Sequence, residues 1–516
     1  MPHVELHPVM APHLATSLLL FGLSLLHLWM IGSGLWPLSA DEAHYWEWSR
    51  SLDWSYYSKG PMVAYLIAGS TWLGGQTAFW IRLPAVILGT AVAALAAIQA
   101  SQMFQKARAG LLTVAILGVM PLFAAGSIIM TIDPPFVFCW TLAGYCLWRV
   151  VQRRRAGGWY GAGIAFGLGL LSKYTMLMLA PCVLLWLVGS PRLRPWLRRR
   201  EPYEAFALGL LIFSPVVVWN ARHGWLSAQH VLVQAGAGAE PTLATSLLSA
   251  LEFFGSQVGL VSPLLFFLML GALVWAGRGG LRQGRDDLWL LVCLSLPVLL
   301  FFQGWSFLAK VQGNWVAHAY VTSSIALAGW ALSWRDWGAE WQRTRRLKLC
   351  LQASIILPAA LLAIFFLLDA GAFGLRIPER LDLVSKRLRG WPELGEAVGS
   401  IIRQRPRPPF VMSDRYQIAS ELAFHIPGQP RVYNVNLGRR MNQYDLWGGW
   451  EALRGRDALF VTYGQVEPPP DLQEAFDRVV RLLVVPIVDR GQHLRDFSII
   501  LGEGFRGFPS RPFAGH

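Results

Sequence analysis

Two carboxylates and a lysine follow the first long apolar run of the chain. The stretch SADEAHYWEWSRSLDWSYYSKGPMVAYL, residues 39–66, holds Asp41, Glu42 and Lys59 among many aromatic residues. A carboxylate at a membrane surface can accept the proton of an attacking hydroxyl, and a lysine there can bind an anionic headgroup or a lipid phosphate. The alternatives are structural: Ser39 or Asp41 caps a short helix, and the Lys59 side chain extends to the lipid headgroups.

The aromatic residues of this stretch also have a structural interpretation. They include Trp46, Trp48, Trp54, Tyr56 and Tyr57. Aromatic rings that are half wet and half apolar are typical of the water–membrane interface. A belt of interfacial rings is therefore the expectation for most of them.

A third carboxylate, Asp133, stands alone in MTIDPPF at the end of an apolar run. A lone carboxylate at membrane depth is costly unless it is paired or caps a helix. Pro134 is suited to the first position of a helix, so Asp133 is also a natural N-cap. Both a chemical and a capping role remain open.

Further polar side chains occur in connections that the charge pattern places on the same side of the membrane. They come from SKYT, WNARHGWLSAQH and LAKVQGNW, and we take them as candidates for substrate binding together with Tyr57: Lys173, Tyr174, Asn220, Arg222, His223, His230, Lys310 and Asn314. His223 and His230 could bind a metal, but their separation in a loop is a weak metal signature and favours hydrogen bonding. No metal site is assigned.

Composition shows what kind of chain must position these residues. Of 516 residues, 54% are hydrophobic and only 15% are charged, and the apolar residues form runs long enough to cross a bilayer. The net charge of +14 is concentrated in short connections such as 153–155, 192–200 and 343–348. This distribution follows the positive-inside rule and argues against a nucleic-acid partner.

The apolar runs and the charges of the connections together predict about eleven transmembrane helices. The expected spans are 13–36, 82–102, 110–129, 132–150, 158–171, 174–190, 203–220, 247–275, 288–305, 316–334 and 348–370. Residues 61–75 are short for a span, and a crossing there would put later loops on the wrong side, so they predict an interfacial helix. The first run is expected to be a retained helix; the alternative is a cleaved signal peptide ending at "LSA".

The sequence after residue 370 is polar and predicts a different fold. Residues 405–435 predict a strand, a helix and a strand, and DALFVTYG, VVRLLVVPIV and FSIILGEGF predict further strands. We therefore expect a polytopic α-helical membrane domain over 1–370, with interfacial helices in a first outer loop at 37–81, and a small C-terminal extracytoplasmic α/β domain over 371–516. The five cysteines lie in or beside apolar segments and predict no disulfide framework.

The order of several short motifs carries a resemblance. The "DE" pair after the first span, YYSKGP, RLPAVILG, DPP, GLGLLSKYT, NARHGW and GNW, in that order, resemble the GT-C superfamily of membrane glycosyltransferases. Within it the chain is similar to the bacterial protein O-mannosyltransferase and lipid A aminoarabinose-transferase group, families 39 and 83. The resemblance covers most of residues 13–370.

The resemblance implies an inverting enzyme of the bacterial plasma membrane. Such enzymes take a sugar from a polyprenyl-phosphate donor at the outer face and pass it to a lipid, glycan or protein acceptor. Asp41 then corresponds to the general base, supported by Glu42, Lys59 to the donor-phosphate ligand, and Asp133 to a carboxylate near the active site. Where the aminoarabinose transferases carry a glutamate before this lysine, a candidate metal ligand, the chain has Ser58; no cofactor or metal is therefore assigned.

The chemistry of such a donor agrees with the charges. A lipid phosphate leaves as an anion, so Lys59, Lys173, Arg222 and Lys310 would stabilise the developing charge. A phosphate acceptor would need no base, and Asp41 would then matter less. The alternative is a flippase or transporter of polyprenyl lipids, which predicts a polar pathway through mid-membrane and often inverted repeats; the sequence shows no internal repeat and few acids within the spans.

Overall fold

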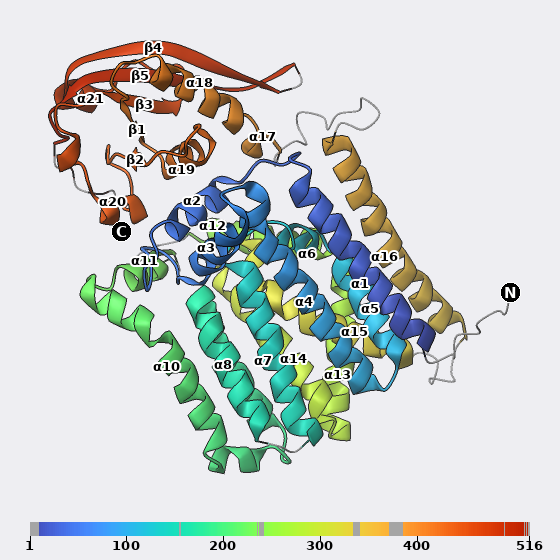
Figure 1. Ribbon diagram of the computed structural model, residues 1–516. Coiled ribbons are helices and arrows are strands. Elements are labelled where there is room, and N and C mark those ends of the chain that lie inside the picture. Colours follow the sequence, from blue (N-terminus) through green and yellow to red (C-terminus); the bar gives the residue numbers. More distant parts are fainter. Residues whose placement is uncertain are drawn as a thin grey trace.

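A computed structural model describes residues 10–153, 156–234, 236, 242–333, 341–370, 385–489, 491–509, 511 and 513. The residue after the expected domain boundary at 370/371, the arginines at 154 and 155, and residues 335–340 of the 335–347 connection lie outside the described residues. The described residues form a helical part and a C-terminal sheet domain at one end of it (Figure 1).

Among the described residues, seven helices are long and apolar enough to cross a membrane. They are α1 (Met10–Gly32), α4 (Ala78–Phe104), α10 (Glu201–Arg222), α12 (Leu243–Val261), α13 (Pro263–Gln283), α14 (Asp286–Trp305) and α16 (Trp341–Asp369). Their outer faces carry exposed large apolar side chains, as expected where lipid rather than water is the solvent. The protein is a multi-pass membrane protein.

The other expected spans correspond to shorter or more polar helices packed among these seven. They are α5 (Ala107–Gly118), α6 (Pro121–Gly126), α7 (Asp133–Arg153), α8 (Gly157–Ser172), η1 (Tyr174–Met178), α9 (Leu179–Gly189) and α15 (Ala317–Ser333). Glycine allows α8 and α10 to approach closely, because a Cβ on Gly163 would lie 2.3 Å from the carbonyl oxygen of Ala205. Helix α11 (Leu226–Gln234) follows α10, and short turns η2 (Arg194–Arg198) and η3 (Gly313–Val316) complete the connections.

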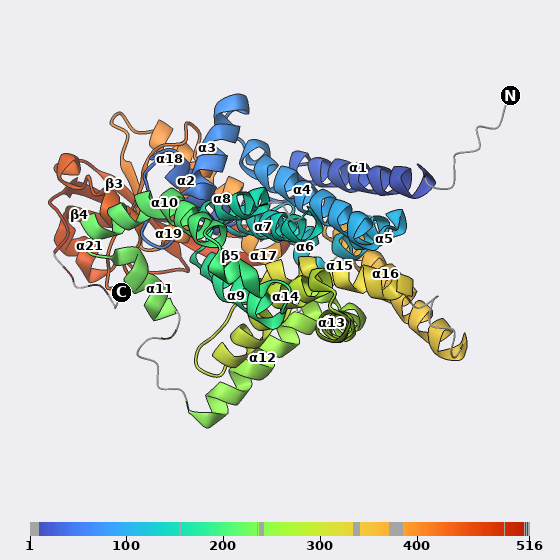
Figure 2. The ribbon, with the colours of Figure 1, turned by 90° about the horizontal axis from the view of Figure 1, so that it is seen from below.

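Two expected spans are wrong in detail. The segment 247–275 is two helices, because Ser262 has a positive φ of 82° and Pro263 begins α13. The segment 110–129 breaks before Pro121, which has no N–H to continue the ladder and begins α6. The expected interfacial helix at 61–75 is present as α3 (Met62–Gly74), beside α2 (Ala40–Ser49) at the end of the bundle near the sheet domain (Figures 1 and 2).

The C-terminal domain has the predicted strand–helix–strand start. Strand β1 (Phe410–Ser413), helix α19 (Tyr416–His425) and strand β2 (Val432–Asn434) are followed by β3 (Ala458–Tyr463), β4 (Phe476–Asp489) and β5 (Gln492–Phe505). The sheet order is β2-β1-β3-β5-β4. Strand β1 is parallel to its neighbours β2 and β3, whereas β5 is antiparallel to its neighbours β3 and β4. Helices α17 (Ser385–Leu388), α18 (Trp391–Arg403), α20 (Gln443–Trp447) and α21 (Pro470–Ala475) and turn η5 (Glu451–Leu453) complete it.

One apolar core joins the two parts. Trp46, Trp48 and Tyr56 of the 37–81 segment are at most 1% exposed and share a cluster with Ile418 and Leu422 of α19. The expectation of an interfacial belt is therefore wrong for these rings, because the C-terminal domain covers them. Trp54, in contrast, is 48% exposed.

A partly buried ion-pair network also joins the parts. Arg389 donates to Asp369 at the end of α16 and to Asp489 at the end of β4, each at 2.6 Å. Trp36, after α1, donates to the same Asp369. The network thus holds the ends of two membrane helices to the sheet.

We predict that Arg389→Ala destabilises the protein by about 3 kcal/mol, because it removes one cation that pairs with both Asp369 and Asp489. The measurement is the midpoint of thermal unfolding in detergent. The matched control is Arg403→Ala, which removes an exposed pair with Glu396 and is expected to cost no more than about 1 kcal/mol. Equal midpoints for the two variants would contradict the network's role.

Candidate active site

The start of α2 fixes the direction of Asp41. Ser39 is the N-cap: its hydroxyl accepts from the Glu42 N–H, while Glu42 accepts from the Ser39 N–H at 2.9 Å. This reciprocal pair is a capping box. Because Ser39 does the capping, the carboxylate of Asp41 is not used by the helix.

Glu42 has a second, buried partner in α4. Arg82 donates to both Glu42 carboxylate oxygens at 2.7 Å, and the Met130 N–H donates to Oε1 at 3.0 Å. The side chain of Glu42 is 0% exposed and that of Arg82 is 6% exposed. Glu42 therefore fastens α2 to α4 and to the segment before α7, and we infer that it positions Asp41 rather than moving protons itself.

Asp41 lines a cavity of about 610 Å³ between the first outer loop, α11 and the C-terminal domain. The Tyr416 hydroxyl, at the start of α19, donates to Asp41 Oδ1 at 3.2 Å. Burial raises the pKa of Asp41, while the Tyr416 hydrogen bond and the charge of Lys59 oppose that rise. A carboxylate with a raised pKa is a stronger base once it is ionised.

Lys59 lines the same cavity and donates to Gln234 of α11 at 3.2 Å. Burial lowers its pKa to about 8, and Lys173 acts in the same direction, whereas Asp133 and Asp41 oppose it. The following glycine is needed for packing, because a Cβ on Gly60 would lie 2.1 Å from the Leu171 carbonyl oxygen of α8.

Asp133 joins three connections. At the start of α7 its carboxylate accepts from Lys173, after α8, at 2.7 Å and from Asn314 of η3 at 2.5 Å. The Lys173 side chain is 9% exposed. The charges of Lys173 and Asp133 act on the pKa of Lys59, but neither residue lines the cavity that Lys59 shares with Asp41. The expected convergence of Asp41, Lys59 and Asp133 stays a prediction.

Some of the other residues that the sequence predicts for substrate binding line this cavity, and others do not. Tyr57 and His230 line it, as does Ser58. The remaining candidates are held elsewhere: Arg222 is exposed over the Trp54 ring, His223 stacks on Trp219, Tyr174 packs on Phe213, and Lys310 forms an exposed pair with Glu252. Asn220 caps the α10–α11 turn by accepting from the Ser227 N–H.

No group of three histidine, cysteine or acidic side chains in the described part of the chain is arranged to hold a metal ion. The lining residue before Lys59 is Ser58, whose hydroxyl is a poor metal ligand compared with a carboxylate. The side chains present do not fit a metal, and no step is derived through one.

Sequence reasoning missed the contribution of the C-terminal domain. Tyr416 reaches Asp41, and Arg439 and Arg440 line the opposite wall of the cavity. The only local signal in this region is the Asn442–Asp445 capping box at the start of α20, which predicts a helix start and not a site. Contacts of such high sequence separation have no local pattern.

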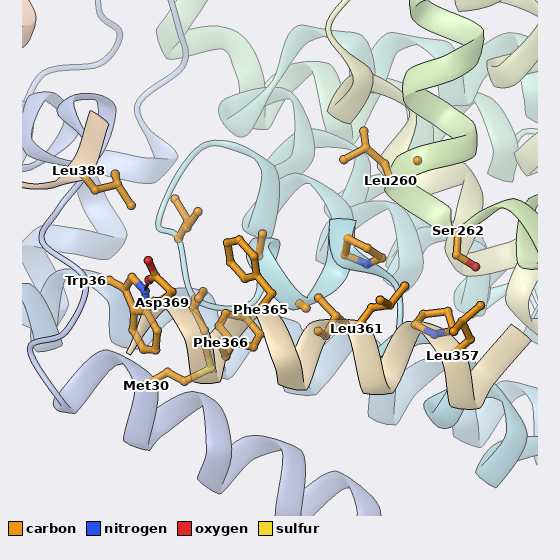
Figure 3. Close-up of a pocket in the computed structure, with 18 of the residues that line it drawn as sticks. Met30, Trp36, Leu260, Ser262, Leu357, Leu361, Phe365, Phe366, Asp369 and Leu388 are labelled. Carbon is orange, nitrogen blue, oxygen red and sulfur yellow. Dashed lines mark hydrogen bonds between the residues drawn. The ribbon is translucent and has the colours of Figure 1, made fainter. Parts of the chain in front are cut away.

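An apolar groove of about 720 Å³ lies on the other side of the first turn of α2. Glu42 and Arg82 line its polar end, and α1, α6, α12, α13 and α16 form its walls. Figure 3 shows Leu357, Leu361 and Phe365 of α16 along the groove, with Trp36 and Asp369 at one end. A long apolar chain would fit these walls.

Comparison with known proteins identifies the family. Residues 58–219, which include Lys59, Asp133 and Lys173, match the family model described as dolichyl-phosphate-mannose-protein mannosyltransferase. Over 408 residues the chain is 30% identical to lipid A galacturonosyltransferase RgtD of Rhizobium johnstonii, an alignment covering 78% of this chain and 80% of that protein. The chain belongs to the GT-C superfamily of membrane glycosyltransferases. An undecaprenyl phosphate-alpha-4-amino-4-deoxy-L-arabinose arabinosyl transferase of Erwinia tasmaniensis is 28% identical to this GT-C enzyme over 50% of this chain and 47% of that protein.

Solved structures show the same fold. ArnT from Cupriavidus metallidurans in the apo state matches this GT-C glycosyltransferase with a TM-score of 0.59 at 14% identity, over 94% of this chain and 97% of that chain. The oligosaccharyltransferase of Archaeoglobus fulgidus matches with a TM-score of 0.55 at 13% identity, over 89% and 70% of the two chains. The predicted fold class, superfamily and enzyme class are confirmed.

The role inferred for Glu42 predicts a specific pattern of stability. Glu42→Met or Arg82→Met alone should each cost about 3 kcal/mol, because each leaves an unpaired buried charge. The double variant should be more stable than either single one, since no unpaired charge remains. Thermal unfolding in detergent measures all three; a double variant less stable than both singles would contradict a mainly electrostatic role.

Proposed function

We propose that this glycosyltransferase moves one sugar, with inversion, from a polyprenyl-phosphate donor to a hydroxyl of an envelope lipid. The observation that carries the proposal is the presence of Asp41 and Lys59 in one cavity, a base and a cation beside an apolar groove. The names of the relatives support the substrate classes: one is a lipid A galacturonosyltransferase, and others are named for an undecaprenyl phosphate-linked sugar.

The proposed reaction is a single displacement. The acceptor hydroxyl attacks the anomeric carbon while Asp41 takes its proton, and the lipid phosphate departs with the electrons of the broken carbon–oxygen bond. Lys59 would donate to the oxygens of this phosphate as their charge develops. The base would contribute about 10²–10⁴-fold to the rate.

Neighbouring side chains would position Asp41 and Lys59 for this reaction. The Tyr416 hydroxyl orients Asp41, and the Lys173–Asp133–Asn314 cluster sets the charge around Lys59. Because Lys173 is already paired with Asp133, Lys59 is the cation more available to a phosphate. We assign Asp133 a positioning role.

The groove is the proposed place for the apolar chain of a lipid substrate. Its walls are apolar, whereas the cavity that holds Asp41 mixes charged and aromatic side chains. Asp41 and Glu42 are consecutive, so the cavity and the groove lie on either side of the first turn of α2. A lipid-linked sugar could therefore keep its chain in the groove and its headgroup beside Asp41.

The proposed orientation places the C-terminal domain outside the cytoplasm of a bacterial cell, over the plasma membrane, with residues 371–516 as its extent. Arginine-rich connections support this, because the η2 connection before α10 lies at the end of the bundle remote from that domain (Figure 1). The positive-inside rule then assigns the η2 end to the cytoplasm.

The pH dependence of kcat/KM should be bell-shaped. Activity rises with pH as Asp41 loses its proton at its raised pKa, and it falls above about pH 8 as Lys59 loses its charge. In Lys59→Arg the guanidinium stays charged, so the falling limb should move to higher pH. An unchanged falling limb in this variant would contradict the role of Lys59.

Asp41→Asn should lower transfer at least about 100-fold, because the amide cannot accept the proton. The measurement is mass spectrometry of envelope lipids and proteins from cells with the wild type, no protein, Asp41→Asn and the control Glu396→Gln. Glu396 is an exposed carboxylate of α18. A sugar-sized mass should be absent only from the deletion and Asp41→Asn samples. If the Asp41→Asn sample retains this mass, the assignment of Asp41 as the general base is contradicted.

A further inference from the structure

The wall of the cavity opposite Lys59 is a rigid loop of the C-terminal domain. Arg439 donates to both carboxylate oxygens of Asp445, at 2.8 and 2.7 Å, and to the carbonyls of Asn434 and Val435. Asn442 caps α20 and donates to the Asn434 side chain at 2.7 Å. These bonds fix the loop and neutralise Arg439.

The next residue, Arg440, differs from Arg439 in its surroundings. It is exposed on one side and lines the cavity, and among the described residues its guanidinium has no hydrogen-bond or ion-pair partner. Its charge nevertheless acts on groups across the cavity: it opposes the burial-induced rise in the pKa of Tyr57, and it adds to the burial that lowers the pKa of His230 to about 4. Arg440, Tyr57 and His230 line the same cavity.

The lining of the same cavity includes buried polar atoms without partners among the described residues. Tyr57 is 3% exposed and His44 is 7% exposed, yet the Tyr57 hydroxyl and the Nδ1 atoms of His44 and His230 have no hydrogen-bond partner among the described residues. All three side chains line the cavity. Buried polar atoms are rarely left unpaired, so these atoms indicate that a ligand group completes the site.

The charges around the cavity favour an anion. Arg415 lies 3.8 Å from Asp414, Arg439 is paired with Asp445, and Asp41 and Lys59 offset one another. One cation, Arg440, remains without a counter-charge. A guanidinium beside a phenol and imidazoles offers hydrogen-bond donors to a carboxylate or phosphate.

We propose that Arg440, Tyr57 and His230 form a subsite for an anionic group of the substrate, separate from the position of the donor phosphate at Lys59. The inference rests on the proposed function and narrows its substrates. The anion is either the carboxylate of a uronic acid carried by the donor or a phosphate carried by the lipid acceptor. A donor sugar with a free amino group is disfavoured there, because its ammonium would face the Arg440 charge.

The first test measures binding without turnover. The probes are galacturonic acid 1-phosphate and galactose 1-phosphate, titrated calorimetrically into the purified full-length protein. If the carboxylate is the anion, Arg440→Gln should weaken the uronate about 10-fold more than the neutral sugar, the loss expected for a hydrogen bond to a charged group. Arg440→Lys should retain part of the preference, and Tyr57→Phe should reduce it.

The second test measures transfer in lipid nanodiscs. Donors are polyprenyl phosphates bearing galacturonate, galactose or 4-amino-4-deoxyarabinose, and acceptors are lipid A with and without its phosphates. A loss in Arg440→Gln that depends on the donor carboxylate assigns the subsite to the sugar, and a loss that depends on acceptor phosphates assigns it to the acceptor. Both outcomes support an anion subsite.

The control is Arg407→Gln, because Arg407 is an exposed arginine of the same domain and does not line the cavity. If Arg440→Gln behaves like Arg407→Gln in both tests, or loses activity equally with every donor and acceptor, the anion subsite is overturned. If the wild type binds the uronate through Arg440 but transfers no sugar, the proposed function fails and the subsite stands.

Discussion

The buried ion pair between Glu42 and Arg82 is the interaction on which the arrangement of the site depends. Removing two charges from water is costly, and the attraction between them offsets this cost only when their hydrogen bonds are also satisfied. Here Arg82 also donates to the carbonyls of Trp36 and Pro37, and Glu42 accepts from the Met130 N–H. The pair thereby fixes the first turn of α2 against α4 and the approach to α7, and Asp41 takes its position from that turn.

The need to pair a buried charge also explains the surroundings of Asp133. Asp133 would be costly at membrane depth if it were alone, and Lys173 and Asn314 neutralise and hydrogen-bond it. Each member comes from a different connection, so the cluster also holds together the ends of α7, α8 and η3. Lys59 and Asp41 are left free to face the cavity.

The C-terminal domain is part of the site and not only an appendage. Its helix α19 covers the aromatic residues of the first outer loop, and Tyr416 reaches Asp41. The network of Arg389, Asp369 and Asp489 anchors the sheet to the end of α16. The cavity therefore has one wall from α2, the loop that carries Lys59 and α11, and one from the sheet domain.

Much of this could be predicted from the sequence because its causes are local. Apolar runs predicted the membrane helices, and apolar strands predicted the sheet. The order of "DE", "SKG" and "DPP" carried the resemblance that pointed to Asp41, Lys59 and Asp133, of which Asp41 and Lys59 line one cavity. The break at Ser262 was missed because apolar composition continues through it. The places of Tyr416 and Arg440 in the site, and the burial of Trp46, depend on packing between segments that are distant in the sequence. Lys310 has the same local sequence signal as Lys59, although it forms a solvent-exposed ion pair with Glu252.

The most direct measurement of the central claim is an experimental structure of the protein in a lipid nanodisc with a polyprenyl phosphate bound. The account predicts phosphate density within hydrogen-bonding distance of Lys59, on the Asp41 side of α2, and chain density along the groove beside Leu361 and Phe365. Phosphate bound at another place, with the Asp41 cavity and the groove both free of lipid, would contradict it.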